Sequence, residues 1–248
     1  MAPGHDVPVV QFVWFRANDQ SLADPFLFQA VRDTAQGWQE KGLNAQYWGT
    51  SVTQAKEFYW LLFWQSHAHA TAIKTDPSYP TFFQDREALA TAPVFEVHVP
   101  FSGDPLRMVE APVTEVDFYK TDDREVNPDA KPVAEIHDMV RRVNRRIELL
   151  QLPGFIALNW GIAIEDGTRA VSLGAWKSIE DHMRLGMLDE DEHRLFVEET
   201  EEIFKNLTEV SVGHVYFKSH GMPVPPHEPK AVSVKPRYLD ISRLMLDL

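Results

Sequence analysis

The chain contains no cysteine among its 248 residues. This absence excludes disulfide frameworks, thiol nucleophiles and zinc or iron–sulfur sites with cysteine ligands. No apolar run approaches the roughly 18 residues that a membrane-spanning helix needs. The first residues also lack a basic segment followed by an apolar one, the pattern of a secretory signal. We therefore expect a cytoplasmic protein without a membrane partner.

Positive charge is also scarce, because 24 Lys and Arg face 37 Asp and Glu, which gives a net charge of −13. Such a chain repels phosphate groups at long range, so nucleic acid is not an expected partner. No G-x-G-x-x-G follows a predicted strand, and no dinucleotide cofactor is predicted. Apolar residues make up 44% of the chain, which is enough for a sizeable core.

An internal repeat is the most informative feature of the sequence. The segment 47–66, YWGTSVTQAKEFYWLLFWQS, aligns without a gap with the segment 159–178, NWGIAIEDGTRAVSLGAWKS. The preceding runs VVQFVWFRAN and VTEVDFYKTD also match, as do EVHV around His98 and VGHVYF around His214. A chain that repeats its organisation once contains two copies of one supersecondary unit.

Each half predicts the order β-α-β-β-α-β. Short runs rich in β-branched and aromatic residues predict strands; they cover 9–17, 47–51, 58–65 and 94–101, then 113–121, 155–164, 170–176 and 210–218. Apolar residues at helical spacing predict the helices; these begin after Asp24 and Ser66 in the first half, and run over 136–150 and from Ser178 in the second.

This order predicts four segments in the chain. Residues 1–103 form the first repeat, 104–112 a linker, 113–218 the second repeat and 219–248 a proline-rich C-terminal arm. The arm ends in apolar residues and is expected to dock on the body of the protein or on another subunit. A monomer and a homodimer both remain open.

Each unit of this order gives an antiparallel sheet with two helices on one face. The first strand of the chain is apolar on both faces, so the face without helices must be buried too. We therefore expect an α+β fold in which the two sheets pack face to face into one barrel with the helices outside.

The chain resembles the ferredoxin-like dimeric α+β barrel superfamily, and most of all its antibiotic biosynthesis monooxygenase branch, with two copies in tandem. The resemblance rests on the strand–helix order, the aromatic first strands and the W-x-S joints Trp64-Gln65-Ser66 and Trp176-Lys177-Ser178. It implies a small hydrophobic or aromatic ligand between sheet and helices. The superfamily supports several chemistries, so no catalytic residue is carried over from it.

His98 and His214 lead the candidate catalytic residues. They lie at matching places in the last predicted strand of each half and should face the same way. A buried imidazole that stays neutral can act as a base near neutral pH. The alternative is a strand-end histidine that only hydrogen-bonds the backbone.

His67 and His69 follow Ser66 at the expected start of a helix, which disfavours an imidazolium ion and keeps either ring basic. The second half has Ile179 and Asp181 at these positions, so the feature is not duplicated. The alternative is a pair of exposed histidines near the cap. A metal site of His67, His69 and His98 is not predicted, because H-x-H without a nearby carboxylate pattern is a weak signal.

Five residues are candidates for binding the substrate. Tyr47, replaced by Asn159 in the second half, carries a hydroxyl group that would orient a substrate oxygen. The others are the aromatic residues and the strand-end cation Trp14, Trp60, Tyr119 and Arg16. The alternatives are aromatic rings that fill the barrel and a solvated strand end.

These features predict an enzyme that uses no cofactor and acts on a hydrophobic, aromatic or polyketide-like small molecule. A histidine would remove a proton from an acidic C–H bond or phenol, leading to monooxygenation, cyclisation or isomerisation in secondary metabolism. Haem binding, with His182 or His193 as candidate ligands, is the first alternative, because some branches of the superfamily bind haem. A stress-type module that binds a ligand without turning it over is the second.

Overall fold

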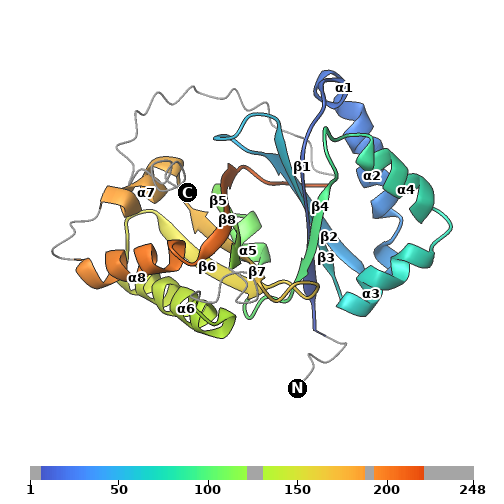
Figure 1. The fold of residues 1–248 in the computed structure, drawn as a ribbon. Helices are drawn as coiled ribbons and strands as arrows, with labels where there is room; N and C mark the ends of the chain where they lie inside the picture. The colour runs from blue at the N-terminus through green and yellow to red at the C-terminus, as the bar shows by residue number, and fades with distance from the viewer. Residues whose placement is uncertain (1–6, 122–130, 188–192, 221–248) are drawn as a thin grey trace.

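The computed structural model describes residues 7–121, 131–187 and 193–220. Figure 1 shows two β-sheets facing each other in the middle of the molecule, with one group of helices outside each sheet. The strands and helices predicted from the sequence occur in the predicted order. The fold class is therefore α+β, as predicted.

The first half supplies strands and helices in the order expected for one ferredoxin-like unit. They are β1 (Val9–Arg16), α1 (Asp19–Ala23), α2 (Pro25–Gln36), the 3-10 helix η1 (Gln39–Lys41), β2 (Leu43–Thr50), β3 (Glu57–Trp64), α3 (His67–Ala72), the 3-10 helix η2 (Ile73–Thr75), α4 (Tyr79–Glu87) and β4 (Phe95–Val99).

The second half repeats this order after a short helix. Its elements are α5 (Leu106–Val109), β5 (Val113–Thr121), α6 (Val133–Leu150), β6 (Phe155–Ile162), β7 (Arg169–Trp176), α7 (Ile179–Met183), the 3-10 helix η3 (Arg184–Met187), α8 (Arg194–Phe204), β8 (Leu207–Val215) and β9 (Lys218–Ser219).

The helices begin at the positions predicted from their capping residues. Asp24 accepts a hydrogen bond from the backbone N–H of Phe26, and Pro25 occupies the first position of α2. Ser66 and Ser178 cap α3 and α7 in the same way, each accepting from the N–H three residues later. The capping side chains satisfy backbone donors that would otherwise lack partners.

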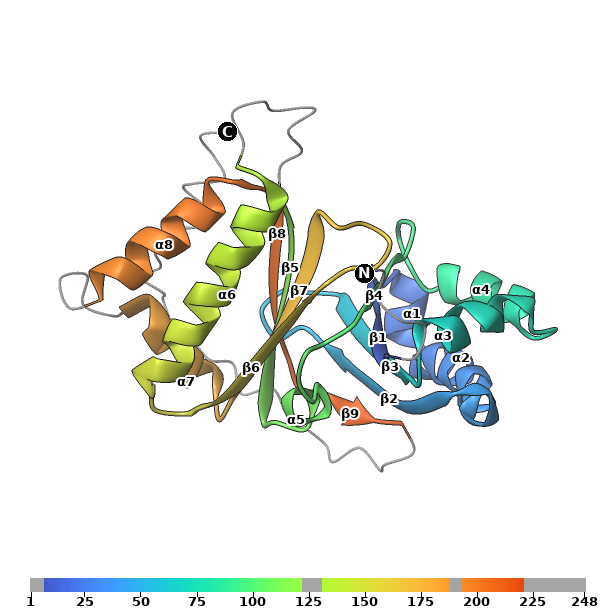
Figure 2. The ribbon, with the colours of Figure 1, turned by 90° about the horizontal axis from the view of Figure 1, so that it is seen from below.

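The two sheets have the strand orders β4-β1-β3-β2-β9 and β6-β7-β5-β8. All pairs within them are antiparallel. The last strand predicted over 210–218 is in fact two strands: β8 closes the second sheet, and β9 crosses to pair with β2 of the first (Figure 2). The segment 104–112, predicted as a linker, contains α5.

Three apolar clusters follow from this packing. The cluster between the sheets includes Phe12, Leu61, Val116 and Leu173. One outer cluster packs the first sheet against α2–α4, and the other packs the second sheet against α6 and α8. The faces of both sheets are therefore covered, which explains why β1 is apolar on both sides.

The repeated glycines Gly49 and Gly161 mark the seams where the two sheets meet. A Cβ atom on Gly49 would lie 2.7 Å from the carbonyl oxygen of Tyr216, and one on Gly161 would lie 2.7 Å from that of Pro100. Backbone hydrogen bonds join the same seams, from Val52 N–H to His214 O at 2.8 Å and from Ile164 N–H to His98 O at 2.9 Å. The repeat in the sequence thus encodes a repeated closure of the barrel.

Among the described residues, no helix has the length and apolar character that crossing a bilayer would require.

The close approach of the sheets at the seam predicts how a substitution at Gly161 changes the stability of the fold. We expect Gly161→Ala to lower the free energy of unfolding by about 1–3 kcal/mol, because the new methyl group overlaps a backbone carbonyl that cannot rotate away. Gly167→Ala is the matched control, since a Cβ there meets nothing within 4 Å, and it should change stability by about 0.5 kcal/mol or less. Urea unfolding of both variants measures the difference, and equal effects would contradict the account of the seam.

Candidate functional site

His98 and His214 occupy equivalent positions on the outer faces of the two sheets. His98 lies opposite Gln11 in the neighbouring strand, and His214 lies opposite Glu115. Both rings are buried, with 2% and 4% of the residue exposed. Each faces a helix layer and not the barrel interior, because its strand neighbours Val99 and Val215 belong to the cluster between the sheets. The prediction that the two histidines face the same way is confirmed.

His98 is held by a glutamate from the other half of the chain. Glu165 lies in the β6–β7 connection; its Oε2 accepts a hydrogen bond from the His98 backbone N–H at 3.0 Å, and its Oε1 contacts His98 Nδ1. His67, the first residue of α3, brings its Nε2 to 3.7 Å from the same Oε1. His67, His98 and Glu165 form what we call the seam cluster.

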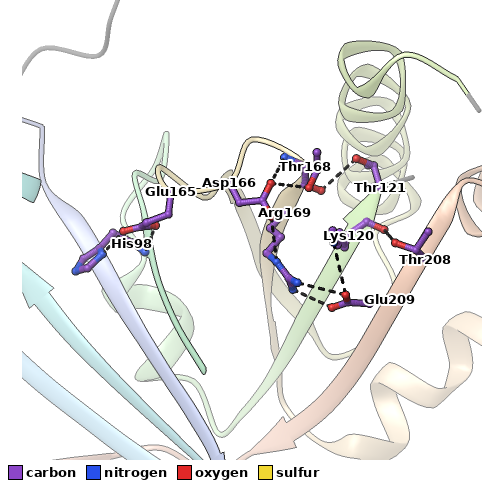
Figure 3. A network of polar contacts seen from close by, with 9 residues as sticks. All are labelled: His98, Lys120, Thr121, Glu165, Asp166, Thr168, Arg169, Thr208 and Glu209. Atoms are coloured by element: carbon purple, nitrogen blue, oxygen red, sulfur yellow. Dashed lines mark hydrogen bonds and ion pairs between the residues drawn. The ribbon is translucent and has the colours of Figure 1, made fainter. Parts of the chain in front are cut away.

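The connection that carries Glu165 is fixed on its other side (Figure 3). Asp166 accepts hydrogen bonds from the backbone N–H and the hydroxyl group of Thr168, at 3.0 and 2.6 Å, and pairs with Arg169 at 3.2 Å. Glu165 and Asp166 point in opposite directions in the figure, toward β4 and toward the second sheet. The turn therefore holds Glu165 against His98.

His214 belongs to a second, more deeply buried cluster. Its Nε2 lies 2.7 Å from Nδ1 of His182, and Nε2 of His182 lies 3.0 Å from Oε1 of Glu115. Trp176 donates its indole N–H to Glu115 Oε2 at 3.0 Å. Glu115, His182 and His214 form a continuous chain of contacts from a carboxylate to a histidine, which we call the relay.

Burial and charge set the protonation states within the relay. Burial alone would raise the pKa of Glu115, but the neighbouring His182 and the hydrogen bonds from His182 and Trp176 hold it below its usual range. Burial works against a charged His182, yet Glu115 raises the pKa of that ring. Burial, followed by the charge of His182, lowers the pKa of His214 to about 4. His214 is thus neutral at physiological pH.

Asp117 and Tyr119 continue the row that Glu115 begins, since alternate residues of β5 share a face. Burial and then the charge of Glu115 raise the pKa of Asp117 well above its usual value, which keeps the acid protonated. Burial also raises the pKa of Tyr119. The row therefore holds two neutral groups: protonated Asp117 hydrogen-bonds Glu115, and the hydroxyl group of Tyr119 has no partner.

The layer between the second sheet and its helices contains many polar atoms without partners. Among the described residues, the buried atoms in this layer without a hydrogen bond are Asp117 Oδ1, Tyr119 Oη, His137 Nε2, Asn144 Nδ2 and His214 Nδ1. Each such atom costs about 1–3 kcal/mol when it stays unpaired. A bound polar ligand or water would remove that cost.

The central strands of the two sheets differ in the size of the side chains that face their helices. Phe58, Trp60 and Leu62 of β3 correspond in the repeat to Ala170, Ser172 and Gly174 of β7. Trp60 is fully buried and packs edge to face against Phe28. In the second half, Asp117 and Trp160 face the helices and yet remain partly exposed. The first layer is thus packed with rings, and the second has smaller and more polar side chains on its central strands.

The remaining predicted site residues do not share one place. Trp14 stacks on Phe118 between the sheets, with ring centroids 5.9 Å apart. Tyr47 packs on Phe63 and donates its hydroxyl group to Glu110 at 2.9 Å.

The other candidates lie outside the relay or already contact neighbouring side chains. Trp60 fills the first helix layer, and Arg16 is exposed at the end of β1. His69 contacts the Ser66 hydroxyl at 2.8 Å through its Nδ1. Tyr119 alone among the five substrate-binding candidates lies in the same layer as the relay.

The haem candidates differ in their surroundings. His182 does not fit the role of an axial ligand in this arrangement, because both of its ring nitrogens contact other side chains. His193 precedes α8 and lines a surface hollow of about 410 Å³ together with Arg146, Arg194, Leu149 and Phe196. His193 is the haem candidate that borders a surface hollow.

The sequence reasoning missed Glu115, Asp117 and Glu165. The first two carried a signal: acidic residues at alternate positions of a strand that the architecture covers with helices must be buried. Glu165 carried none, because a glutamate in a turn is ordinarily solvated and only the seam brings it to His98.

No family model matches the chain, and no curated protein matches it in sequence. Solved structures do match. An anthrone oxidase-like protein superposes with a TM-score of 0.60 at 10% identity, covering 92% of this chain and 99% of its own. A monooxygenase candidate from Fusobacterium nucleatum subsp. nucleatum gives 0.57 at 9% identity, covering 87% and 94%.

A mutant chlorite dismutase from Candidatus Nitrospira defluvii gives a TM-score of 0.50 at 9% identity, covering 84% of this chain and 90% of its own. Identities this low establish the fold alone. The fold is the ferredoxin-like α+β fold that these monooxygenase-like proteins and chlorite dismutase share.

The lowered pKa of His214 predicts how the stability of the fold depends on pH. Between pH about 6.5 and about 4, the unfolded chain binds a proton at His214 that the folded protein does not. Lowering the pH through this window should therefore destabilise the fold by up to about 3 kcal/mol from this residue; above pH 6.5 its contribution is constant.

NMR titration of the histidine side chains checks this directly. One imidazole should titrate with a midpoint near pH 4, and its signal should be missing from the spectrum of His214→Gln. A His214 midpoint near 6.5, the value of an exposed imidazole, would contradict the structure of the relay.

Proposed function

We propose that the protein is an enzyme that removes a proton from a hydrophobic, aromatic or polyketide-like molecule bound between the second sheet and the helices α6 and α8. The observation that carries this proposal is the unpartnered Nδ1 atom of His214, buried at the end of a relay that begins at a carboxylate. The small side chains of β7 support the location, because Ala170, Ser172 and Gly174 stand where β3 has Phe58, Trp60 and Leu62.

His214 is the base in this proposal. When His182 is neutral and His214 is in the tautomer with a bare Nδ1, His214 donates from Nε2 to His182 Nδ1, and His182 donates from Nε2 to Glu115. Proton uptake at Nδ1 makes an imidazolium ion, which the Glu115 carboxylate stabilises through His182. A carboxylate that orients and stabilises a catalytic histidine is an established arrangement of acid–base catalysis.

Asp117 and Tyr119 would stabilise the negative charge that the substrate gains. Tyr119 is a neutral donor whose hydroxyl group has no partner, and Asp117 is a neutral acid that hydrogen-bonds Glu115 beside it; donors in an apolar site stabilise a developing oxyanion. Asp117 lies two residue pairs along the sheet from His214, because it pairs with Val212 while Glu115 pairs with His214. Base and oxyanion donors thus line neighbouring parts of one layer.

Oxygenation without a cofactor is the reaction that this arrangement suits best. The carbanion of an anthrone-type substrate is electron-rich enough to reduce molecular oxygen itself. The resulting peroxide then loses water and leaves a quinone carbonyl, so one O₂ converts a CH₂ group into C=O and water. The likeness to an anthrone oxidase-like protein supports this choice. The tandem arrangement of two monooxygenase-like domains, a role in secondary metabolism and a cytoplasmic location belong to the same proposal.

Anthrone, in aerobic buffer with a chelator and no added cofactor, is the test substrate. We expect oxygen uptake and anthraquinone formation, with kcat reduced about 100-fold or more in His214→Gln because the base is lost. His220→Gln, in which the lost ring contacts Asp33 of the first half, is the matched control and should keep its activity. Equal turnover by wild type and His214→Gln would contradict the assignment of the base.

The two alternatives predict different results in the same preparation. A haem protein would show a Soret band after addition of haemin, which His193→Ala would abolish. A module that only binds its ligand would bind anthrone without consuming oxygen, and His214→Gln would bind it equally well.

A further inference from the structure

The seam cluster contains three side chains of the kinds that transition-metal ions prefer. His67, His98 and Glu165 each offer one donor atom, and these atoms all lie within 4.8 Å of one another. Two imidazoles and one carboxylate form a ligand set that zinc enzymes and non-haem iron enzymes share. The sequence did not predict this site, because its carboxylate lies in the other repeat.

We propose that His67, His98 and Glu165 bind one divalent transition-metal ion such as Zn²⁺ at the seam between the two sheets. Ligand atoms about 2.1 Å from a tetrahedral ion lie about 3.4 Å apart. The separation of 3.7 Å between His67 Nε2 and Glu165 Oε1 is close to this value. The ion replaces the direct contact of Glu165 with His98 Nδ1, and a ring proton is released to solvent as it binds.

The backbone segments that carry the ligands are fixed before any ion arrives, and only the contact between Glu165 Oε1 and His98 Nδ1 must open to admit it. His98 is a buried strand residue, and His67 begins a helix that Ser66 caps. Glu165 has its second oxygen bonded to the backbone of His98, while Asp166 fixes the turn (Figure 3). Ligands on rigid elements with supporting hydrogen bonds are the geometry that metal sites need.

The site is also accessible. The side chains of His67 and Glu165 are 31% and 41% exposed, so an ion can enter from solvent and keep a water ligand on that side. Three protein ligands with one open position distinguish such a site from a closed structural site.

Comparison of the two seams shows that closure of the barrel does not require these side chains. At the other seam, His214 corresponds to His98, but Ile179 and Thr53 stand where this seam has His67 and Glu165. Both seams nevertheless form the same backbone hydrogen bond. Closure of the barrel therefore does not explain the added histidine and glutamate, and the proposed metal site is separate from the proposed base in the second helix layer.

The test is a calorimetric titration of the chelator-treated full chain with ZnCl₂. We expect wild type to bind one more Zn²⁺ than Glu165→Gln or His67→Gln, or to bind it about 100-fold more tightly, because a direct ligand matters at least as much as the second-shell groups whose loss costs 10–100-fold. Zn²⁺ should also raise the melting temperature of wild type more than that of either variant.

Glu209→Gln is the matched control. It removes a carboxylate of the neighbouring network, one that pairs with Arg169 at 2.9 Å and touches none of the three ligands, and it should bind Zn²⁺ like wild type. Circular dichroism of each variant verifies folding. Wild type that binds no Zn²⁺, or Glu165→Gln and His67→Gln that match it in both stoichiometry and affinity, would overturn the proposal.

Discussion

Backbone hydrogen bonds across the two seams, from Val52 to His214 and from Ile164 to His98, are the interactions on which the rest of the structure depends. They close two antiparallel sheets into one barrel, and the glycines Gly49 and Gly161 make the close approach sterically possible. The same closure brings Glu165 of one repeat to the last strand of the other. The carboxylate partner of His98 is therefore a consequence of how the barrel closes.

The two helix layers share one pattern of strands and helices but differ in the side chains that fill them. In each half the tryptophan at the end of the third strand donates to the residue beside the strand histidine, which is Gln11 in the first half and Glu115 in the second. The first layer is completed by Trp60 and its aromatic neighbours. The second has small residues on β7 and acidic ones on β5, and we propose that the ligand binds there.

Much of the fold was predictable from the sequence, because the repeat, the strand periodicity and the helix caps are local signals. The strands β5 and β7 and the cap at Ser178 lie within a residue of their predicted places. The site was less predictable. His98 and His214 were found by their repeated position, but their partners depend on contacts between segments far apart in the chain. Trp60 was predicted to bind substrate and instead fills the first core, since an aromatic pattern does not distinguish a pocket from a packed layer.

We propose that a ligand binds against the small side chains of β7. Calorimetric titration with a hydroxyanthraquinone measures this most directly, when wild type is compared with Ser172→Trp, which restores the ring present at Trp60 in the first half. Ser172→Ala serves as the control that leaves the space open. The account predicts saturable binding by wild type and Ser172→Ala, and loss of binding in a folded Ser172→Trp. Undiminished binding by Ser172→Trp would contradict it.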